Sequence, residues 1–191
     1  MTQVSDILAL WQQKGALAYD GEGISQLEHA WQCGQLALQA GATPELQLAS
    51  WLHDIGHLMT DLPGSPTMDG IDDRHENLGA QALLPLWGAA VSEPVRQHVQ
   101  AKRYLVATRP GYADKLSVDS VRSLALQGGP MSSVDCLAFA ARPYALDAQQ
   151  LRAWDDSGKR VGWFAVDVDA ALAELGALMG LVGSRAQAGG F

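Results

Sequence analysis

The chain has 191 residues, enough for one well-buried domain, and no shift in composition along it suggests a second. Because 48% of the residues are hydrophobic and 18% are charged, the composition is that of a globular protein and excludes a disordered one. The formal net charge of -8 argues against a nucleic-acid partner, since a protein that follows a phosphate backbone needs a basic face.

The N-terminal residues have neither the basic region nor the apolar region of a signal peptide, and no run approaches the roughly 18 apolar residues of a membrane span. We therefore expect a cytoplasmic protein that does not bind a membrane. Cys33 and Cys136 are too few for a disulfide framework, and we expect both to be reduced packing residues on helices.

Apolar residues recur at helical spacing along most of the chain, and no stretch shows the period-two alternation of a strand. Start signals such as Thr43-Pro44-Glu45, and glycines that stop helices, divide this pattern into separate segments. The predicted helices cover about 4–15, 25–40, 43–58, 75–87, 92–104, 117–126, 133–140, 148–154 and 167–178, with a glycine- and proline-rich loop over 61–74.

These segments predict an all-α fold, because helices without strands must bury their apolar faces against one another. We expect a single domain over 1–191, with an ordered core of about 3–182 and a flexible tail at 183–191.

The stretch Trp51–His57 places an adjacent histidine and aspartate, His53 and Asp54, inside an otherwise apolar predicted helix. Burial of such a pair is unfavourable unless hydrogen bonds or a metal ion replace the lost hydration. Both side chains can reach one pocket from the same turn, and His57 lies one turn further on, on roughly the same face as His53. For either histidine taken alone, the alternative is a core residue whose ring nitrogens are hydrogen-bonded within the protein. Three potential metal ligands so close together favour a metal site instead.

Four of the histidines, His29, His53, His75 and His98, lie on separate predicted helices. Helix bundles build metal sites from side chains on facing helices. With Asp54 as a bridge and one later carboxylate, these histidines would supply enough ligands for two metal ions. Imidazole and carboxylate ligands without a thiolate suit iron or manganese better than a structural zinc.

The order of these residues resembles that of the HD-domain metalloproteins: a histidine, an adjacent His-Asp pair, two further histidines and a distant aspartate. More narrowly, the chain resembles the PhnZ-type mixed-valent diiron oxygenases of phosphonate catabolism. The segments that carry the narrower resemblance are 19–22, 25–29, 49–57, 101–106, 126–131 and 152–155. The resemblance implies a single-domain HD-type helical bundle.

The resemblance also implies a set of metal ligands. One iron would be held by the residues matching His29, His53 and Asp155, the other by His75 and His98, with Asp54 as the bridge. Two adjacent carboxylates, Asp155 and Asp156, compete for the last position. We choose Asp155 because Lys159 then follows at the spacing seen in the family, which leaves Asp156 as a solvated acid at a helix end.

A gate and a substrate pocket are implied in the same way. Tyr19 would occupy an iron in the resting enzyme and swing away with Glu22 when substrate enters; without the family, Tyr19 would be a packing aromatic beside a glycine turn. The positions that match the substrate pocket of the family are His57, Lys102, Ser120, Ser123, Gln127 and Arg152, and Asp20 beside the gate could supply charge for an amino group. Two cations and several neutral donors suit a dianionic phosphonate.

The implied cofactors are two iron ions as an Fe(II)/Fe(III) pair, with O2 as co-substrate, and the implied partner is a small organophosphonate. The reaction would cleave the carbon–phosphorus bond of a 1-hydroxy-2-aminoethylphosphonate or its trimethylated form, giving phosphate and glycine or glycine betaine. Asp20 and the tryptophans Trp31, Trp51, Trp154 and Trp163 slightly favour the trimethylated substrate, since aromatic faces bind quaternary ammonium groups.

Two alternatives remain at this point. HD proteins with the same ligand series include dinuclear phosphohydrolases and phosphodiesterases, in which the metals activate water. A non-catalytic metal-binding regulatory domain is the second alternative, disfavoured because every ligand position is filled. The sequence does not distinguish between N-substituents, stereoisomers of the substrate or oligomeric states.

Overall fold

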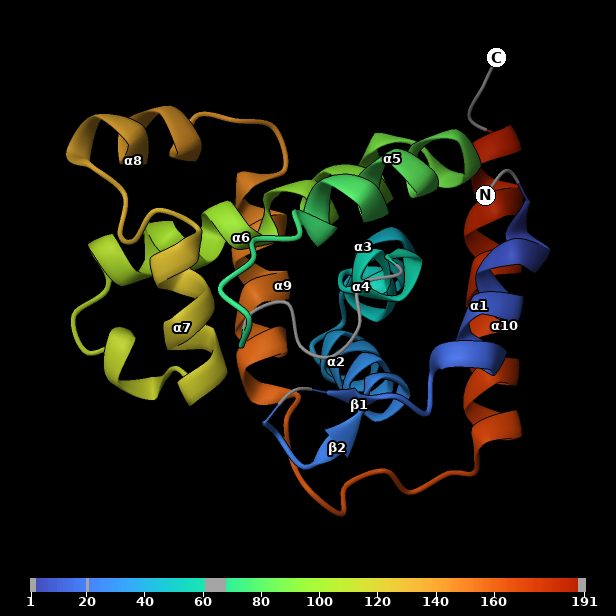
Figure 1. Cartoon of the computed structure of the whole chain (residues 1–191). Coiled ribbons are helices and arrows are strands. Elements are labelled where there is room, and N and C mark those ends of the chain that lie inside the picture. The colour runs from blue at the N-terminus through green and yellow to red at the C-terminus, as the bar shows by residue number, and fades with distance from the viewer. Residues whose placement is uncertain (1–2, 20, 61–67, 189–191) are drawn as a thin grey trace.

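The computed structural model describes residues 3–19, 21–60 and 68–188, and the predicted all-α fold is confirmed (Figure 1). The helices are α1 (Val4–Lys14), α2 (Gln26–Gln39), α3 (Pro44–Leu52), α4 (Ile55–Met59), α5 (His75–Trp87), α6 (Ala89–Thr108), α7 (Val118–Leu126), α8 (Ser133–Ala140), α9 (Ala145–Ser157) and α10 (Val168–Ala188), with a short 3-10 turn at Ala113–Lys115. Two-residue strands β1 (Ala18–Tyr19) and β2 (Ile24–Ser25) pair antiparallel, a feature too short for the sequence pattern to show.

Several helices begin where their capping residues predict. Ser25 and Glu28 form a capping box at the start of α2, and Thr43 accepts a hydrogen bond from the backbone of Leu46 before Pro44 opens α3. Ser117 caps α7 in the same way. These local hydrogen bonds fix the positions at which the helices that carry the site begin.

The helix α3 lies at the centre of the fold, in contact with α2, α6, α9 and α10 (Figure 1). Its side chains Leu48 and Leu52 are fully buried in the main hydrophobic core. The helices α7 and α8 lie to one side, and α8 packs on α6 and α9 around Phe139. The elements that carry the adjacent His53 and Asp54 are therefore enclosed on several sides, where a polar group needs a partner.

The predicted continuous helix over 43–58 is wrong in one respect. The helix α3 ends at Leu52, Asp54 leaves helical geometry with φ -99° and ψ 7°, and α4 begins at Ile55. The sequence offers no glycine or proline there, so local propensity gives no sign of the break. Because of it, His53 and Asp54 lie at a junction between two helices.

Other boundaries also differ from the prediction. The helix α6 begins at Ala89 rather than near Ser92, and Pro94 lies within it. Gly88, with φ 75°, separates α5 from α6 and fixes the earlier start. The helix α10 runs through Ala188, so residues 183–188 are helical where the sequence predicted a tail. Within the ranges described above, no helix combines the length and apolar character needed to span a bilayer.

One glycine sets how closely α4 approaches α5. A Cβ atom added at Gly56 would lie 2.0 Å from the carbonyl oxygen of His75, so the two backbones are in direct contact. Only glycine permits this approach. The start of α5, and with it His75, is thereby held against the helix that follows Asp54.

Substitution of Gly56 by alanine should force α4 and α5 apart. We expect the free energy of unfolding to fall by about 1–3 kcal/mol, the usual effect of overpacking. The matched control is Gly180→Ala in α10, where an added Cβ meets nothing within 4 Å; it should leave stability unchanged or raise it by up to about 1 kcal/mol. Denaturant unfolding of the two variants measures the difference, and equal effects would contradict the close contact.

Candidate metal centre and anion pocket

Four buried histidines from four elements meet in two pairs. His29 of α2 and His53 at the end of α3 have their Nε2 atoms 3.2 Å apart, and the Nε2 atoms of His75 of α5 and His98 of α6 are also 3.2 Å apart. Two nitrogens at this separation can both lie about 2.1 Å from one ion. The structure thus brings together the four histidines that the sequence assigned to metal binding.

Asp54 lies between the two pairs and offers one carboxylate oxygen to each. Its Oδ2 atom is 3.6 Å from Nε2 of His29 and 3.3 Å from Nε2 of His53. Its Oδ1 atom is 3.4 Å from Nε2 of His75 and 3.6 Å from Nε2 of His98. This arrangement is suited to a carboxylate that bridges two ions.

The opposite ring nitrogen of each histidine is held by an acceptor. The Nδ1 atom of His29 donates to the carbonyl of Gly158 at 2.9 Å, that of His53 to Ser50 at 2.9 Å, and that of His98 to Val95 at 2.7 Å. The Nδ1 atom of His75 donates to the carboxylate of Asp73 at 3.0 Å. A proton fixed on Nδ1 leaves the Nε2 lone pair free to bind a metal, as is usual for histidine ligands.

Asp155 of α9 completes the first pair. Its Oδ1 atom lies 3.4 Å from Nε2 of His29 and is a buried acceptor that receives no hydrogen bond, while Oδ2 pairs with Arg152 at 2.6 Å. Asp156, the alternative carboxylate, instead bonds to Arg152 and to Tyr112. The free oxygen of Asp155 is what a metal ligand at this position requires, and Asp156 is a partner of Arg152 rather than a solvated acid.

Both carboxylates of the centre are held in the charged form. Burial alone would raise the pKa of Asp54, but the surrounding imidazoles, His53 above all, hold it well below its usual range. Burial would likewise raise the pKa of Asp155, and Arg152 and Lys159 outweigh it. Two buried anions therefore face the histidine pairs.

The imidazoles of the first pair differ in proton affinity. Burial lowers the pKa of His29, whereas for His53 the charge of Asp54 outweighs burial and raises the pKa to about 10. Burial also lowers the pKa of His98 well below its ordinary value. Imidazoles facing two carboxylates are a donor set that fits hard or borderline divalent and trivalent cations, and an ion bound at the first pair would displace the proton of His53.

Tyr19 of β1 covers the first pair. Its hydroxyl donates to Oδ2 of Asp54 at 3.0 Å, and its ring stacks on His29 with centroids 4.0 Å apart. Burial and then the charges of Asp54 and Asp155 raise the pKa of the phenol well above its ordinary value. Near it, Glu22 pairs with Lys159 at 3.5 Å. Tyr19 therefore lies at the centre with its phenol protonated, and Glu22 contacts the centre only indirectly, through Lys159.

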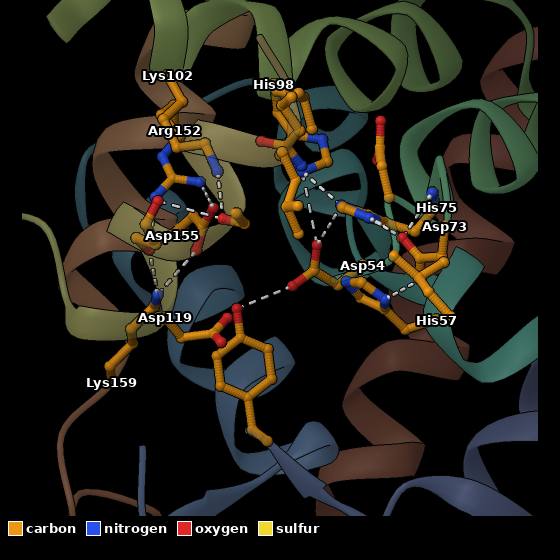
Figure 2. A pocket seen from close by; sticks show the side chains of 18 residues that line it. Asp54, His57, Asp73, His75, His98, Lys102, Asp119, Arg152, Asp155 and Lys159 are labelled. Carbon is orange, nitrogen blue, oxygen red and sulfur yellow. Dashed lines mark hydrogen bonds and ion pairs between the residues drawn. The ribbon is translucent and has the colours of Figure 1, made fainter. Parts of the chain in front are cut away.

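A pocket opens beside the metal centre and is lined by cations on one side. Figure 2 shows His75 and His98 near Asp54 and, across the pocket, Lys102, Arg152 and Lys159. The sequence-predicted pocket residues His57, Lys102, Ser120, Ser123, Gln127 and Arg152 all line it, together with Ile71, Asp72, Asp73, Asp119 and Lys159, to which the sequence assigned no role.

The hydroxyl groups of this pocket are fixed by its cations. Lys102, only 2% exposed, donates to Ser123 at 2.7 Å. Ser120 accepts from Arg152 at 3.2 Å and from Lys159 at 3.2 Å. The side-chain oxygen of Gln127 is buried without a partner. Several donors thus converge beside the metal centre, as binding of a tetrahedral anion requires.

His57 is not part of either histidine pair. It hydrogen-bonds to Asp73 at 2.6 Å and stacks on His75 with ring centroids 3.8 Å apart. Asp73 lies near the end of a glycine- and aspartate-rich stretch of sequence. No periodic pattern there distinguishes one acid from the others as a functional residue. Its position two residues before His75 is the signal that could have identified it.

The tryptophan pocket that the sequence suggested for a trimethylammonium group is not found among the described residues, where Tyr19 is the aromatic side chain besides the histidines in the pocket lining. No tryptophan lines the pocket there. Trp31 packs against Trp163 and Phe164, and Trp51 is buried in the core. Asp20, offered for the same amino group, lies outside the described residues.

The cysteines are free, as predicted. The sulfur of Cys33 lies 3.7 Å from Nε2 and 3.8 Å from Nδ1 of His29, so it packs alongside the ring. Burial raises the pKa of this thiol well above its ordinary value, and it is therefore protonated.

A helical fold that places two histidine pairs on one carboxylate, beside a pocket lined by cations, is the arrangement of an enzyme site able to hold metal ions and a small anion. No protein-family model matches the chain. It is, however, 42% identical over 161 residues to the hydroxymethylphosphonate dioxygenase of Gimesia maris, covering 84% of this chain and 80% of that protein. It is 38% identical over 158 residues to the glycine-betaine-forming 1-hydroxy-2-(trimethylamino)ethylphosphonate dioxygenase of Leisingera caerulea. This match covers 82% of this chain and 80% of that protein.

An uncharacterized protein of Acanthamoeba polyphaga mimivirus is 34% identical over 158 residues, covering 82% of this chain and 72% of that protein. At these identities and coverages, the chain belongs to the PhnZ-type family of phosphonate dioxygenases and is an oxygenase. The predicted family and enzyme class are confirmed, and the hydrolase and the non-catalytic domain are disfavoured.

Addition of Mn(II), or of Fe(II) without oxygen, should raise the melting temperature, because the ions bind the folded centre and not the unfolded chain. At free metal 100 times the dissociation constant, one site contributes about 2.7 kcal/mol. Asp54→Asn should abolish most of the shift, since both histidine pairs share this charge. Asp114→Asn, an exposed acid in the turn Ala113–Lys115, is the control and should keep the full shift. An unchanged shift in Asp54→Asn would contradict a shared carboxylate.

Proposed function

We propose that this chain uses two iron ions and O2 to cleave the carbon–phosphorus bond of a 1-hydroxyalkylphosphonate. The observation that carries the proposal is the division of the Asp54 carboxylate between two histidine pairs, directly beside the cationic pocket. Both relatives with named activities are dioxygenases of 1-hydroxyphosphonates, which supports the same substrate class here.

The iron ligands that we propose are those suggested by the sequence. His29, His53 and Asp155 would hold one ion, His75 and His98 the other, and Asp54 would bridge them. In the Fe(II)/Fe(III) state, this pair would supply the redox chemistry that activates O2 and oxidises C1 of the substrate.

The cationic side of the pocket would hold the phosphonate group. Lys102 offers a buried ammonium, and Ser120 and Ser123 present hydroxyls already oriented by cations. Arg152 is shared with Asp155 and Asp156, so it aligns the metal ligand as well as the anion. Anchoring of the phosphonate at this side would direct the adjoining C1 hydroxyl toward the metal centre.

Tyr19 would give way when substrate enters. In the structure its hydroxyl occupies the Oδ2 side of Asp54, next to the first histidine pair. Glu22, paired with Lys159, links the same β1–β2 hairpin to the anion pocket. A substrate that reaches the first metal position must displace the phenol, which is consistent with the gate implied by the family.

The atoms of the proposed reaction balance with one O2 per turnover. C1 is oxidised to the level of a carboxylic acid, the carbon–phosphorus bond breaks, and the phosphorus leaves as phosphate. The trimethylated substrate gives glycine betaine, the primary amine gives glycine, and hydroxymethylphosphonate gives formate.

The group attached to C1 would face the part of the pocket lining that includes Ile71 and Asp72, whereas Asp119 lies beside Lys159 and pairs with Arg122 (Figure 2). A carboxylate at Asp72 suits a cationic substituent by charge, but no tryptophan among the described residues lines the pocket to favour a trimethylated group. We therefore extend the proposed substrates to hydroxymethylphosphonate and to 1-hydroxyphosphonates with a primary or trimethylated amine.

The iron-loaded protein should consume O2 and release phosphate in a 1:1 ratio with at least one of these three substrates. An oxygen electrode and a phosphate assay on the same sample measure the ratio. The matched control is 2-aminoethylphosphonate, which lacks the 1-hydroxyl and should not react. Phosphate release without oxygen consumption would identify the protein as a hydrolase instead.

The activity should depend on the charge of Lys102. Burial, together with the positive charges of Arg152 and Lys159, lowers the pKa of this ammonium to about 7. A group whose pKa is lowered in this way is charged below pH 7 and loses its charge above it. We expect kcat/KM for the phosphonate to fall by up to about tenfold per pH unit above pH 7.

Lys102→Arg keeps its charge over this range and serves as the comparison, because arginine does not deprotonate. Its kcat/KM should lack the decrease above pH 7, although the buried site makes it less active overall. Identical pH profiles for the two proteins would show that Lys102 is not the titrating group.

A further inference from the structure

One carboxylate joins the metal centre to the anion pocket. Asp73 accepts hydrogen bonds from Nδ1 of His57 through Oδ2 at 2.6 Å and from Nδ1 of His75 through Oδ1 at 3.0 Å. The two rings stack, with centroids 3.8 Å apart and planes 23° from parallel. His57 and His75 are thus fixed side by side by a single acid.

The backbone is shaped to place Asp73 there. Arg74 adopts left-handed geometry, with φ 51° and ψ 37°, which is uncommon for a residue other than glycine. After this turn α5 begins at His75, whose backbone N–H also donates to Oδ1 of Asp73 at 3.3 Å. The contact of Gly56 with the His75 carbonyl holds the other side of the same residue.

The two histidines have different neighbours beyond Asp73. With its Nδ1 proton fixed, His75 presents Nε2 to Oδ1 of Asp54 at 3.4 Å and to His98 at 3.2 Å. His57 lines the anion pocket and belongs to neither histidine pair, although it also lies close enough to Asp73 and His75 for the three to hold an ion. Movement of the Asp73 carboxylate would therefore shift a proposed metal ligand and a proposed substrate contact together.

We infer that Asp73 is a positioning residue that orients His75 for the second metal ion and His57 for the phosphonate. The inference rests on the proposed function for the identity of the metal and the substrate. Carboxylates that orient metal-bound histidines commonly affect metal affinity by about 10–100-fold. Here the same carboxylate would also set the affinity for the substrate.

The test compares Asp73→Asn with Asp69→Asn, an exposed acid in the same part of the chain. An asparagine has one acceptor oxygen and cannot serve both rings. We expect Asp73→Asn to bind its second Mn(II) at least tenfold more weakly, measured by competition with a chelator, and to raise KM for hydroxymethylphosphonate at least tenfold. Asp69→Asn should match the unmodified protein in both measurements.

A double-mutant cycle separates positioning from a general structural effect. His57→Ala alone should raise KM and leave Mn(II) affinity unchanged. Added to His57→Ala, Asp73→Asn should raise KM little further but should still weaken the second Mn(II). Full additivity of the KM effects, or wild-type Mn(II) affinity in Asp73→Asn, would overturn the inference.

Asp73→Glu restores a carboxylate and covers the case in which Asp73→Asn fails to fold. It should recover Mn(II) affinity at least in part; no recovery in a folded protein would count against the positioning role. The Mn(II) measurement needs no turnover. If the unmodified protein binds two Mn(II) but does not oxidise any phosphonate, the proposed function fails while the metal half of this inference is still tested.

Discussion

The carboxylate of Asp54, divided between two pairs of imidazoles, is the interaction on which the rest of the structure depends. A buried anion is unfavourable unless positive charge or hydrogen bonds surround it. Here one oxygen faces His29 and His53 and the other faces His75 and His98, with all four rings oriented by acceptors behind them. The fold brings elements far apart in the sequence to this one group.

The anion pocket follows from the same constraint. Asp155, at the first histidine pair, needs a cation beside it, and Arg152 one turn earlier on α9 supplies it. Lys102 donates to Ser123 and Lys159 donates to Ser120 on the same side of the pocket. The cations that stabilise the buried carboxylate of Asp155 therefore also form the surface that would receive a phosphonate, which would allow a chain of net negative charge to bind an anion.

Much of this arrangement was predictable, for identifiable physical reasons. Capping residues such as Ser25 and Thr43 act through local hydrogen bonds, so the sequence reveals where their helices begin. The break at His53 and Asp54 was not predictable, because neither residue is a helix breaker and the nearest glycine, Gly56, lies inside α4. Tryptophans in the core and tryptophans in a pocket look alike in sequence, so the sequence could only suggest an aromatic wall, and no tryptophan lines the described part of the pocket. Asp73 was missed because no periodic pattern separates it from the neighbouring acids, and its position two residues before His75 is the only local sign of its role.

The four imidazoles differ in what orients them. Main-chain carbonyls of Gly158, Ser50 and Val95 serve three of the rings, whereas a side chain serves His75. A point mutation cannot delete a carbonyl of the main chain, so the orientation of those three rings is inherited with the fold. The acceptor for Nδ1 of His75 is the side chain of Asp73, which a single codon change can replace. A stronger or weaker hydrogen-bond acceptor alters how much electron density the imidazole donates to a metal ion. Evolution can therefore adjust one half of the centre while the other half stays constant.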